Sequence, residues 1–330
     1  MARYDKLKVK GPDFEAGRST DPKPLPTNLL ARALTLVITG VFKVVGGDGS
    51  GTLHPDAVWR ILRALEISGD NATPIRAVAA VFRVIEKFWT RIPGTQVGPV
   101  SLAAGVAQPL EVRIPIPFYM PWSNAPDTCS LALYDTSEPA IQIQCGAASE
   151  LCYGLAAGAV PTFENMRVEM EFQTTDGGPL GRDGQMYGLM MMAFKELILQ
   201  DSGTDQTLDL NLDMSEILAV IVETLDHGVA GSNFRHTDAM ITELSLAVNG
   251  VTARSPISWN SLREENKTDY GLNAREPGVA VFHAAQDRLT GPGELWPVGL
   301  TKPVIKFNAK HTGNGVNKIR VTVIGVARGL

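Results

Sequence analysis

Apolar and polar positions alternate with a period of two along residues 241–248, within a longer stretch that runs to residue 272. Such alternation predicts a β-strand with one face turned toward a core. The Asn249-Gly250 pair that follows predicts a tight turn, and the Ser255-Pro256 pair predicts a break in regular structure. A short helical pattern then ends at Tyr270-Gly271. The stretch is therefore predicted to form a strand, a turn and a helix, in that order.

Residues 61–89 repeat this order of patterns. An alternating segment leads into a turn at Gly69-Asp70-Asn71, and a break at Thr73-Pro74 precedes a helical pattern. Thr73 is predicted to cap a helix over residues 75–89, with Pro74 at its first position. The apolar face of this helix is broad, so we expect it to be buried between sheets or subunits. The residues of that face are Ile75, Val78, Phe82, Ile85 and Trp89.

Similar segments also flank the two stretches. Upstream, LTLVITGVFKVV at 34–45 is matched with MAFKELILQ at 192–200. Downstream, NMRVEMEF at 165–172 is matched with NKIRVTVIGV at 317–326. The spacing differs from one matched pair to the next, which is typical of duplicated domains with unequal loops and not of a solenoid. Chance similarity between two β-rich halves is the alternative.

The remaining chain contains short apolar segments at a spacing of ~8–12 residues, which is typical of an all-β sandwich. Residues 174–185 contain turn residues throughout and no apolar periodicity, so they indicate a domain boundary. A chain of 330 residues is long enough for two domains of ~150 residues each. We expect a first domain over 29–175, a linker over 176–185 and a second domain over 186–330.

Residues 1–28 are predicted to form an N-terminal arm. Prolines at positions 12, 22, 24 and 26 argue against regular structure, and apolar residues are few. The first ten residues carry one arginine and three lysines against one acidic residue. A basic arm on an acidic protein could bind an anionic surface such as lipid headgroups or phosphate. The alternative is a solvated tail.

The formal charge of −5 and the pI near 5.6 argue against a dedicated nucleic-acid surface. The N-terminus is charged where a signal peptide would be apolar, and no apolar run approaches the ~20 residues of a spanning helix. We therefore expect a soluble protein. Cys129, Cys145 and Cys152 form no CxxC pair, which predicts reduced and buried thiols.

The sequence offers one weak candidate for a cation site and no candidate for catalysis. The cation candidates are Asp205, Asp209 and Asp213, which lie on or near an alternating strand. The EF-hand spacing is absent, and a solvated acidic face is the alternative. The five histidines form no metal-binding pattern, and no GxSxG motif occurs. We expect neither an enzyme nor a cofactor.

The helical segment WNSLREENKTDYG at 259–271, with its preceding strand and Asn249-Gly250 turn, resembles a known family. It is similar to the second domain of double-jelly-roll major capsid proteins, which build tailless bacteriophages with an internal membrane. Among these, the sequence most resembles the single-stranded DNA, Finnlakevirus-like members. The segments TGVFKVVGG at 39–47 and IRVTVIGVA at 319–327 lie where that family would have them.

This resemblance implies two tandem eight-stranded jelly rolls, side by side, with short helices in the connecting loops. It also implies a pseudo-hexagonal homotrimer that tiles an icosahedral shell over an internal lipid membrane. The expected partners are other copies of the chain, minor capsid or vertex proteins, and the viral membrane through the N-terminal arm. The expected location is the virion capsid, and the host cytoplasm during assembly.

A two-domain β-sandwich that binds or cleaves carbohydrate is the competing hypothesis. It requires either an aromatic platform or a pair of acids in a cleft. The candidate platform residues are Trp122, Trp259 and Trp296. The candidate acid pairs are Glu169 with Glu171 and Glu264 with Glu265.

Overall fold

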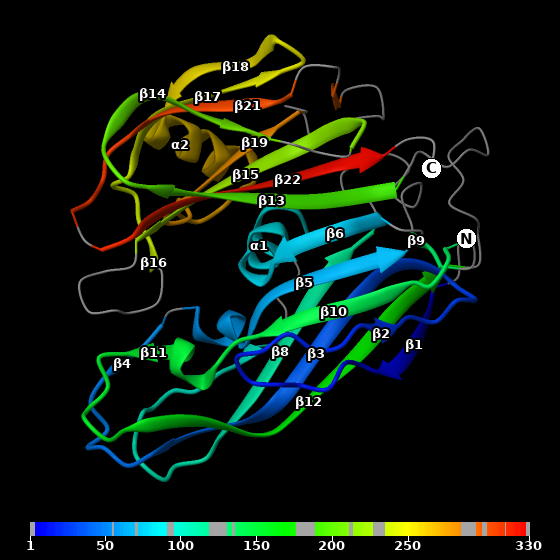
Figure 1. The fold of residues 1–330 in the computed structure, drawn as a ribbon, viewed down its shortest axis with the longest axis vertical. Helices are drawn as coiled ribbons and strands as arrows, with labels where there is room; N and C mark the ends of the chain where they lie inside the picture. Colours follow the sequence, from blue (N-terminus) through cyan, green and yellow to red (C-terminus); the bar gives the residue numbers. More distant parts are fainter. Residues whose placement is uncertain are drawn as a thin grey trace. The chain divides into compact units, whose positions relative to one another are not determined.

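The computed structural model divides into two compact units (Figure 1). Unit 1 comprises Met1–Pro121 and Ala125–Tyr187, and unit 2 comprises Trp122–Asn124 and Gly188–Leu330. The structure describes residues 4–54, 56–69, 72–90, 96–118, 131–133, 136–175, 189–210, 214–226, 235–284, 295–298, 302–313 and 315–327.

Unit 1 contains two antiparallel sheets. The first has the order β1-β12-β3-β8-β7, with β9 paired to β3, and the second has the order β6-β5-β10-β2. The strands of the first sheet are β1 (Tyr4–Lys10), β12 (Val160–Thr175), β3 (Leu30–Val45), β8 (Gln108–Pro117), β7 (Gln96–Val97) and β9 (Leu131–Ala132). Those of the second are β6 (Ala72–Val78), β5 (Leu62–Gly69), β10 (Ala140–Cys145) and β2 (Lys23–Pro24). A small ladder joins β4 (Thr52–Leu53) to β11 (Cys152–Tyr153).

Unit 2 also contains two antiparallel sheets. The first has the order β13-β22-β15-β16, with β19 and β20 also paired to β15, and the second has the order β14-β21-β17-β18. The strands of the first sheet are β13 (Leu189–Leu199), β22 (Asn317–Ala327), β15 (Glu216–Asp226), β16 (Arg235–His236), β19 (Val279–His283) and β20 (Trp296–Pro297). Those of the second are β14 (Gly203–Asp209), β21 (Val304–Ala309), β17 (Ile241–Val248) and β18 (Val251–Ser258).

The two units share one topology. Along the chain, the eight principal strands are β1, β2, β3, β5, β6, β8, β10 and β12 in unit 1, and β13, β14, β15, β17, β18, β19, β21 and β22 in unit 2. In each unit the first strand pairs with the eighth, the eighth with the third, and the third with the sixth. The second pairs with the seventh, the seventh with the fourth, and the fourth with the fifth. A helix lies between the fifth and sixth strands of each unit: α1 (Ala79–Ile85) and α2 (Trp259–Asp269).

This topology corrects one of the matched pairs of segments. Residues 34–45 lie in β3, the third strand of unit 1, whereas residues 192–200 fall mostly in β13, the first strand of unit 2. The third strand of unit 2 is β15, so the upstream match was wrong. The downstream match, β12 with β22, joins the eighth strands of both units. The two strand–turn–helix stretches also occupy equivalent places.

The turn predicted at Asn249-Gly250 is confirmed, because both residues have positive φ angles, of 53° and 74°. Positive φ at both central residues is what a two-residue hairpin turn requires. The breaks predicted before the helices are wrong. Pro256 lies within β18, which pairs with β17, and residues 72–78 form β6, which pairs with β5. The helix predicted over 75–89 therefore begins only at Ala79 and ends in a π-helical turn over Glu86–Thr90.

The predicted absence of regular structure in residues 1–28 is wrong for two segments, residues 4–10 and 23–24, whereas residues 11–22 and 25–28 form no helix or strand. Tyr4–Lys10 forms β1 and pairs along its whole length with residues 169–175 of β12. Lys23–Pro24 forms β2, paired with β10. Prolines 12, 22 and 26 lie outside these strands, and Pro24 lies on a sheet edge, where a missing N–H is tolerated.

Candidate functional site

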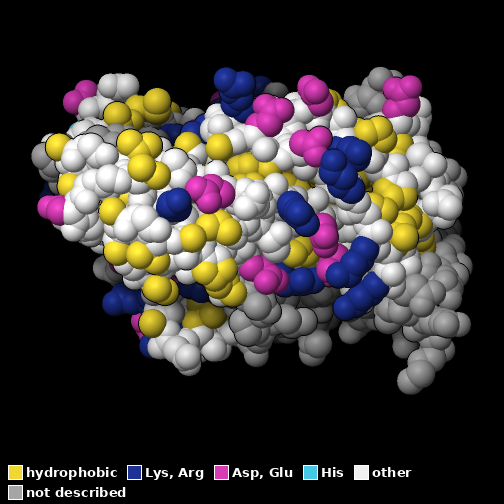
Figure 2. Space-filling model, turned by 90° about the horizontal axis from the view of Figure 1, so that it is seen from below, with side chains coloured by type: hydrophobic (Ala, Val, Ile, Leu, Met, Phe, Trp, Pro, Cys, Tyr) yellow, Lys and Arg dark blue, Asp and Glu magenta, His cyan; other side chains and the backbone are white. Residues whose placement is uncertain are grey.

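The outer strand of unit 1, β1, presents lysines on one of its faces. Lys6, Lys8 and Lys10 are exposed and alternate with Leu7 and Val9. Each lysine lies opposite a polar residue of β12: Gln173, Glu171 and Glu169 respectively. Figure 2 shows one face of the molecule on which cationic and anionic side chains are intermingled, so no large region of one sign is visible there.

Glu171 on β12 receives two cations. The Lys8 Nζ atom lies 2.6 Å from its Oε1 atom, and Arg113 of β8 hydrogen-bonds its Oε2 atom. The carboxylate is nearly buried, with 9% of its side chain exposed. Burial raises the pKa of Glu171, but the hydrogen bonds and charges of Lys8 and Arg113 outweigh burial and hold the pKa below its usual range. The Lys8–Glu171 ion pair attaches β1 to the sheet, so Tyr4–Lys10 acts as a structural strand.

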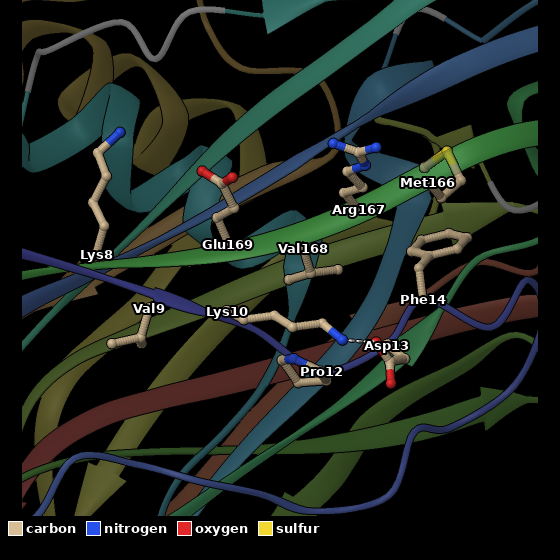
Figure 3. A pocket seen from close by; sticks show the side chains of 10 residues that line it. All are labelled: Lys8, Val9, Lys10, Pro12, Asp13, Phe14, Met166, Arg167, Val168 and Glu169. Carbon is tan, nitrogen blue, oxygen red and sulfur yellow. Dashed lines mark ion pairs between the residues drawn. The ribbon is translucent and has the colours of Figure 1, made fainter.

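A pocket of about 550 Å³ lies beside β1, where β12 shifts its register between Glu164 and Arg167 (Figure 3). It is lined by Lys8, Val9, Lys10, Pro12, Asp13, Phe14, Met166, Arg167, Val168 and Glu169. Phe14 also contacts Phe163 edge-on, with 5.7 Å between ring centroids, and Lys10 forms an ion pair of 2.8 Å with Asp13. Among its described lining residues there is no histidine, cysteine, serine or threonine, and the polar side chains are those of lysine, arginine, aspartate and glutamate.

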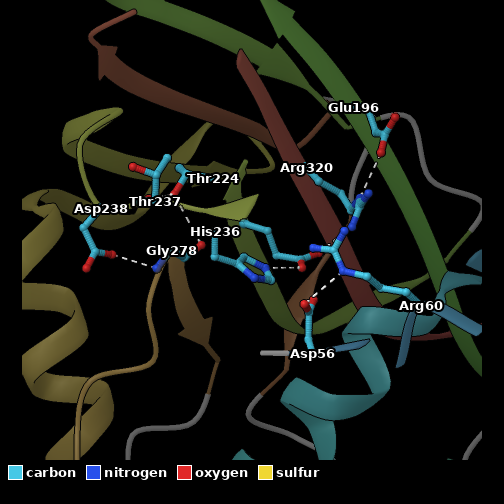
Figure 4. A network of polar contacts seen from close by, with 10 residues as sticks. Asp56, Arg60, Glu196, Thr224, His236, Thr237, Asp238, Gly278 and Arg320 are labelled. Atoms are coloured by element: carbon cyan, nitrogen blue, oxygen red, sulfur yellow. Dashed lines mark hydrogen bonds and ion pairs between the residues drawn. The ribbon is translucent and has the colours of Figure 1, made fainter. Parts of the chain in front are cut away.

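A buried carboxylate links four strands of unit 2 (Figure 4). Glu223 of β15 is fully buried. Its Oε1 atom lies 3.0 Å from the His236 Nε2 atom of β16, and its Oε2 atom lies 3.5 Å from Arg320 Nη1 of β22. The Arg320 Nε atom in turn donates a 2.9 Å hydrogen bond to Glu196 of β13, which also pairs with Lys318.

Burial raises the pKa of the Glu223 carboxyl, but the charge of Arg320 and the hydrogen bond with His236 outweigh it, so the pKa lies below its usual range. The pKa of Glu196 is lowered in the same way by Lys318 and Arg320, against the effect of burial. Neither acid is free to act as a proton donor near neutral pH. The network is therefore structural: it joins strands that are far apart in the sequence.

The segment 259–271, which carries the resemblance to capsid proteins, forms α2 and its C-terminal cap, and the N-cap is the preceding residue, Ser258. Ser258 caps the N-terminus, because its Oγ atom accepts a 3.1 Å hydrogen bond from the Ser261 N–H. Gly271 follows the last turn with a φ of 59°, and the Leu272 N–H donates to the Lys267 carbonyl. A glycine in the left-handed region at this place is a common way to end a helix.

Buried polar side chains then attach α2 to the strand that follows. The Asn266 side chain donates to the Val281 carbonyl and accepts from the Val281 N–H, each at 2.8 Å. Arg263 donates to the Glu276 carbonyl and forms a 2.8 Å ion pair with Asp238. Trp259 is 1% exposed. These residues position the helix against β19 and carry no chemistry.

The candidate cation ligands do not form a site among the described residues. Asp205 and Asp209 are exposed on β14, and Asp213 lies outside the residues that the structure describes. Over the described ranges, no three His, Cys, Asp or Glu side chains are close enough to hold a metal ion.

The candidate carbohydrate contacts are also dispersed. Trp259 is buried, Trp296 is half-buried on β20, and Trp122 lies outside the described residues. Among the acid pairs, Glu264 pairs with Lys267 and Arg275, Glu265 pairs with Arg254, and Glu171 is neutralised as described above. Glu169 lines the pocket beside β1. No aromatic platform or acid pair in a cleft is thus formed by these candidates within the described parts of the chain.

Cys145 and Cys152 are buried free thiols, as predicted, and Cys129 lies outside the described residues. Burial raises the pKa of Cys152 to about 11. Among the helices that the structure describes, none has the length and apolar character needed to cross a membrane.

No protein-family model and no curated protein matches the chain. Solved structures do match. The STIV major capsid protein aligns with a TM-score of 0.70 at 12% identity, over 99% of this chain and 97% of that chain. The chain has the double-jelly-roll fold. The major capsid protein P2 from bacteriophage PM2 aligns with a TM-score of 0.59 at 11% identity, over 99% of both chains. A chain of the PBCV-1 virus capsid aligns with a TM-score of 0.59 at 12% identity, over 100% of this chain and 96% of that chain.

The predicted fold class, two tandem eight-stranded jelly rolls with short helices in the loops, is thereby confirmed. Sequence reasoning missed β1, β2 and the buried Glu223 network. The alternation of Lys6, Leu7, Lys8, Val9 and Lys10 was the signal that could have identified β1.

Proposed function

We propose that this chain is a viral major capsid protein that acts by self-assembly and has no catalytic role. The observation that carries the proposal is the tandem of two eight-stranded units with identical strand order, matched along nearly the whole length of known capsid proteins. At 11–12% identity the likeness concerns the fold, so the function is our inference from it.

In detail, three copies form a pseudo-hexagonal capsomer. Two similar units per chain give a trimer six similar edges, so that one gene product can pack almost equivalently around a lattice point. Capsomers then tile an icosahedral shell over an internal lipid membrane, with minor capsid or vertex proteins as further partners. The virion is that of a tailless bacteriophage of the single-stranded DNA, Finnlakevirus-like type, and assembly takes place in the host cytoplasm.

The structure changes the role of residues 1–28 in this proposal. Tyr4–Lys10 and Lys23–Pro24 pair with strands of unit 1, so these residues do not form a loose arm that could reach a membrane. If this segment contacts a membrane, the contacting groups are the exposed lysines of β1, which stays paired with β12.

Light scattering on the purified chain tests the proposal. A stable species of three times the 35.5 kDa chain mass, with hexagonal outlines in electron micrographs, is the expected result. A monomer that is insensitive to concentration and salt would contradict the proposal.

A further inference from the structure

Two strands lie at open sheet edges and carry opposite charge. Over the part of the chain that the structure describes, β1 pairs only with β12, and β14 pairs only with β21. Both edges are therefore open to a further strand. On β14, however, the Asp209 carbonyl accepts a hydrogen bond from Lys195 Nζ, and the Asp205 N–H donates to the Asn308 side chain, so a partner strand would have to replace these two bonds. β1 carries Lys6, Lys8 and Lys10, whereas β14 carries Asp205 and Asp209 and no basic residue.

The charges on these edges are only partly compensated within the chain. Lys8 and Lys10 pair with Glu171 and Asp13, but Lys6 has no ion-pair partner among the described residues. Asp205 and Asp209 are exposed and likewise form no ion pair within the described ranges. The positive edge, β1, and the negative edge, β14, therefore each keep charge that a neighbouring strand of opposite charge can neutralise.

We propose that β1 of one copy of this chain pairs antiparallel with β14 of a second copy. This inference rests on the self-assembly proposed above. It names the two strands that form the contact between neighbouring copies, which we call the seam. In one register, Lys6 lies opposite Asp209, Lys8 opposite Thr207 and Lys10 opposite Asp205, while Leu7 meets Leu208 on the other face. Opposite charges directly across two antiparallel strands stabilise the pairing, and like charges oppose it.

The same charges exclude the alternative pairings. Two β1 strands would place lysine opposite lysine, and two β14 strands would place aspartate opposite aspartate. The seam is thus heterologous: unit 1 of one copy meets unit 2 of the next. A heterologous contact generates a ring when its rotation closes. Each copy carries one edge of each kind, so the contact can repeat around such a ring.

The two charge pairs are not equivalent. Residues 206–209 pair regularly with β21, whereas Asp205 has a φ of 51° and lies in a register shift that begins at Gly203. We therefore expect Lys6 with Asp209 to contribute more than Lys10 with Asp205. Leu7 is 38% exposed, so it has apolar surface that the contact with Leu208 of the second copy would bury.

Site-specific crosslinking of the full chain tests the seam. The variant K8C/T207C keeps the four charged residues of the two proposed pairs and places two thiols directly opposite each other. It also removes the Lys8–Glu171 ion pair, a loss that the control below shares. We expect it to form disulfide-linked multimers on oxidation, visible on non-reducing gels. The matched control K8C/T252C moves the second thiol to the outer edge of β18 and should remain unlinked, as should the wild-type chain with its own three cysteines.

Charge reversal gives an independent readout by sedimentation. K6E/K10E and D205K/D209K should each weaken self-association by about tenfold or more, and the combination of all four changes should restore it. An equimolar mixture of the two reversed variants should associate pairwise, because each edge then meets its opposite in the other variant, but it should not close a ring of three, in which one contact would join two copies of the same variant.

The outcomes separate the seam from the function. If the chain forms trimers but K8C/T207C does not crosslink and the reversals have no effect, the seam is overturned and the capsid proposal stands. If the wild-type chain remains monomeric under all conditions, both are overturned.

Discussion

Removing Arg320 should destabilise unit 2 strongly, because its guanidinium is the principal cation for a fully buried carboxylate. In an Arg320→Met variant, His236 is the partner that Glu223 keeps among the described residues, and Glu196 keeps Lys318. The methionine preserves much of the volume of the arginine stem, so the change tests charge more than packing.

The magnitude follows from the burial of Glu223, which is 0% exposed. Breaking a buried ion pair by removing one partner typically costs ~3–5 kcal/mol, because the remaining charge is desolvated without compensation. For a domain of this size, each kcal/mol lowers Tm by about 2–4 °C, so a decrease of roughly 6–20 °C is expected.

The double variant Arg320→Met/Glu223→Gln is the matched control. The amide carries no charge, so most of the lost stability should return even though the variant has one more substitution. Glu223→Gln alone should cost only about 1 kcal/mol, since Arg320 keeps Glu196 as its partner.

Thermal and urea unfolding, followed by circular dichroism at pH 7, measure these effects. Acid titration gives a second signature. Because the pKa of Glu223 is lower in the folded state, its contribution is present above the unfolded value of about 4.3 and is lost as pH falls through the folded pKa. Stability should therefore fall less steeply with acidification in Glu223→Gln than in the wild-type chain.

The reasoning is refuted if Arg320→Met lowers Tm by less than about 2 °C, or if the double variant is no more stable than the single one. Either result would mean that Glu223 does not depend on Arg320 for its charge compensation.

Further predictions concern the strands and the helix that the structure defines. Deleting residues 2–10 should lower the Tm of unit 1 and cause aggregation in light scattering, because the β12 edge is then unpaired; a soluble, equally stable product would contradict this. Asn266→Leu should cost about 2–5 kcal/mol in urea unfolding, since it leaves both backbone groups of Val281 unpaired in the core, whereas a loss below about 1 kcal/mol would show that water replaces the amide. Gly278→Ala should lower Tm by several degrees, because Gly278 has a φ of 62° and an added Cβ would lie 2.7 Å from a backbone nitrogen; an unchanged Tm would exclude that clash. The thiol of Cys152, with its pKa near 11, should resist alkylation at pH 8 in the folded chain and react in urea, and rapid native labelling would contradict its burial.

Much of the fold could be predicted because it is encoded locally. The period-two alternation in residues 241–248 and the Asn249-Gly250 turn depend on side chains and φ preferences of adjacent residues. The same strand–turn–helix order in residues 61–89 indicated a repeated unit. These local patterns also placed the chain among all-β sandwiches.

The candidate site was less predictable, because its residues acquire their roles from partners far away in the sequence. Glu171 lies in a strand whose pattern is visible, yet its cations come from Lys8 and Arg113 on two other strands. In the sequence, Glu223 is one acidic residue within an apolar run, and nothing there indicates its partner. The pairing of β22 with β15 places Arg320 beside it. The pattern of a single strand contains no information on its neighbours.

The sequence by itself therefore determined the fold class, the repetition of a β-rich unit and the turn that organises its second copy. The alternation in residues 6–10 is compatible with a strand, but only the tertiary structure showed its partner, since the hydrogen bonds of Tyr4–Lys10 go to β12, more than 150 residues later. The tertiary structure also decided that the first helix starts at Ala79, because pairing with β5 holds residues 72–78 extended despite their helical periodicity. Strand pairing is a non-local interaction, and a backbone that satisfies its hydrogen bonds in a sheet overrides weaker local preferences.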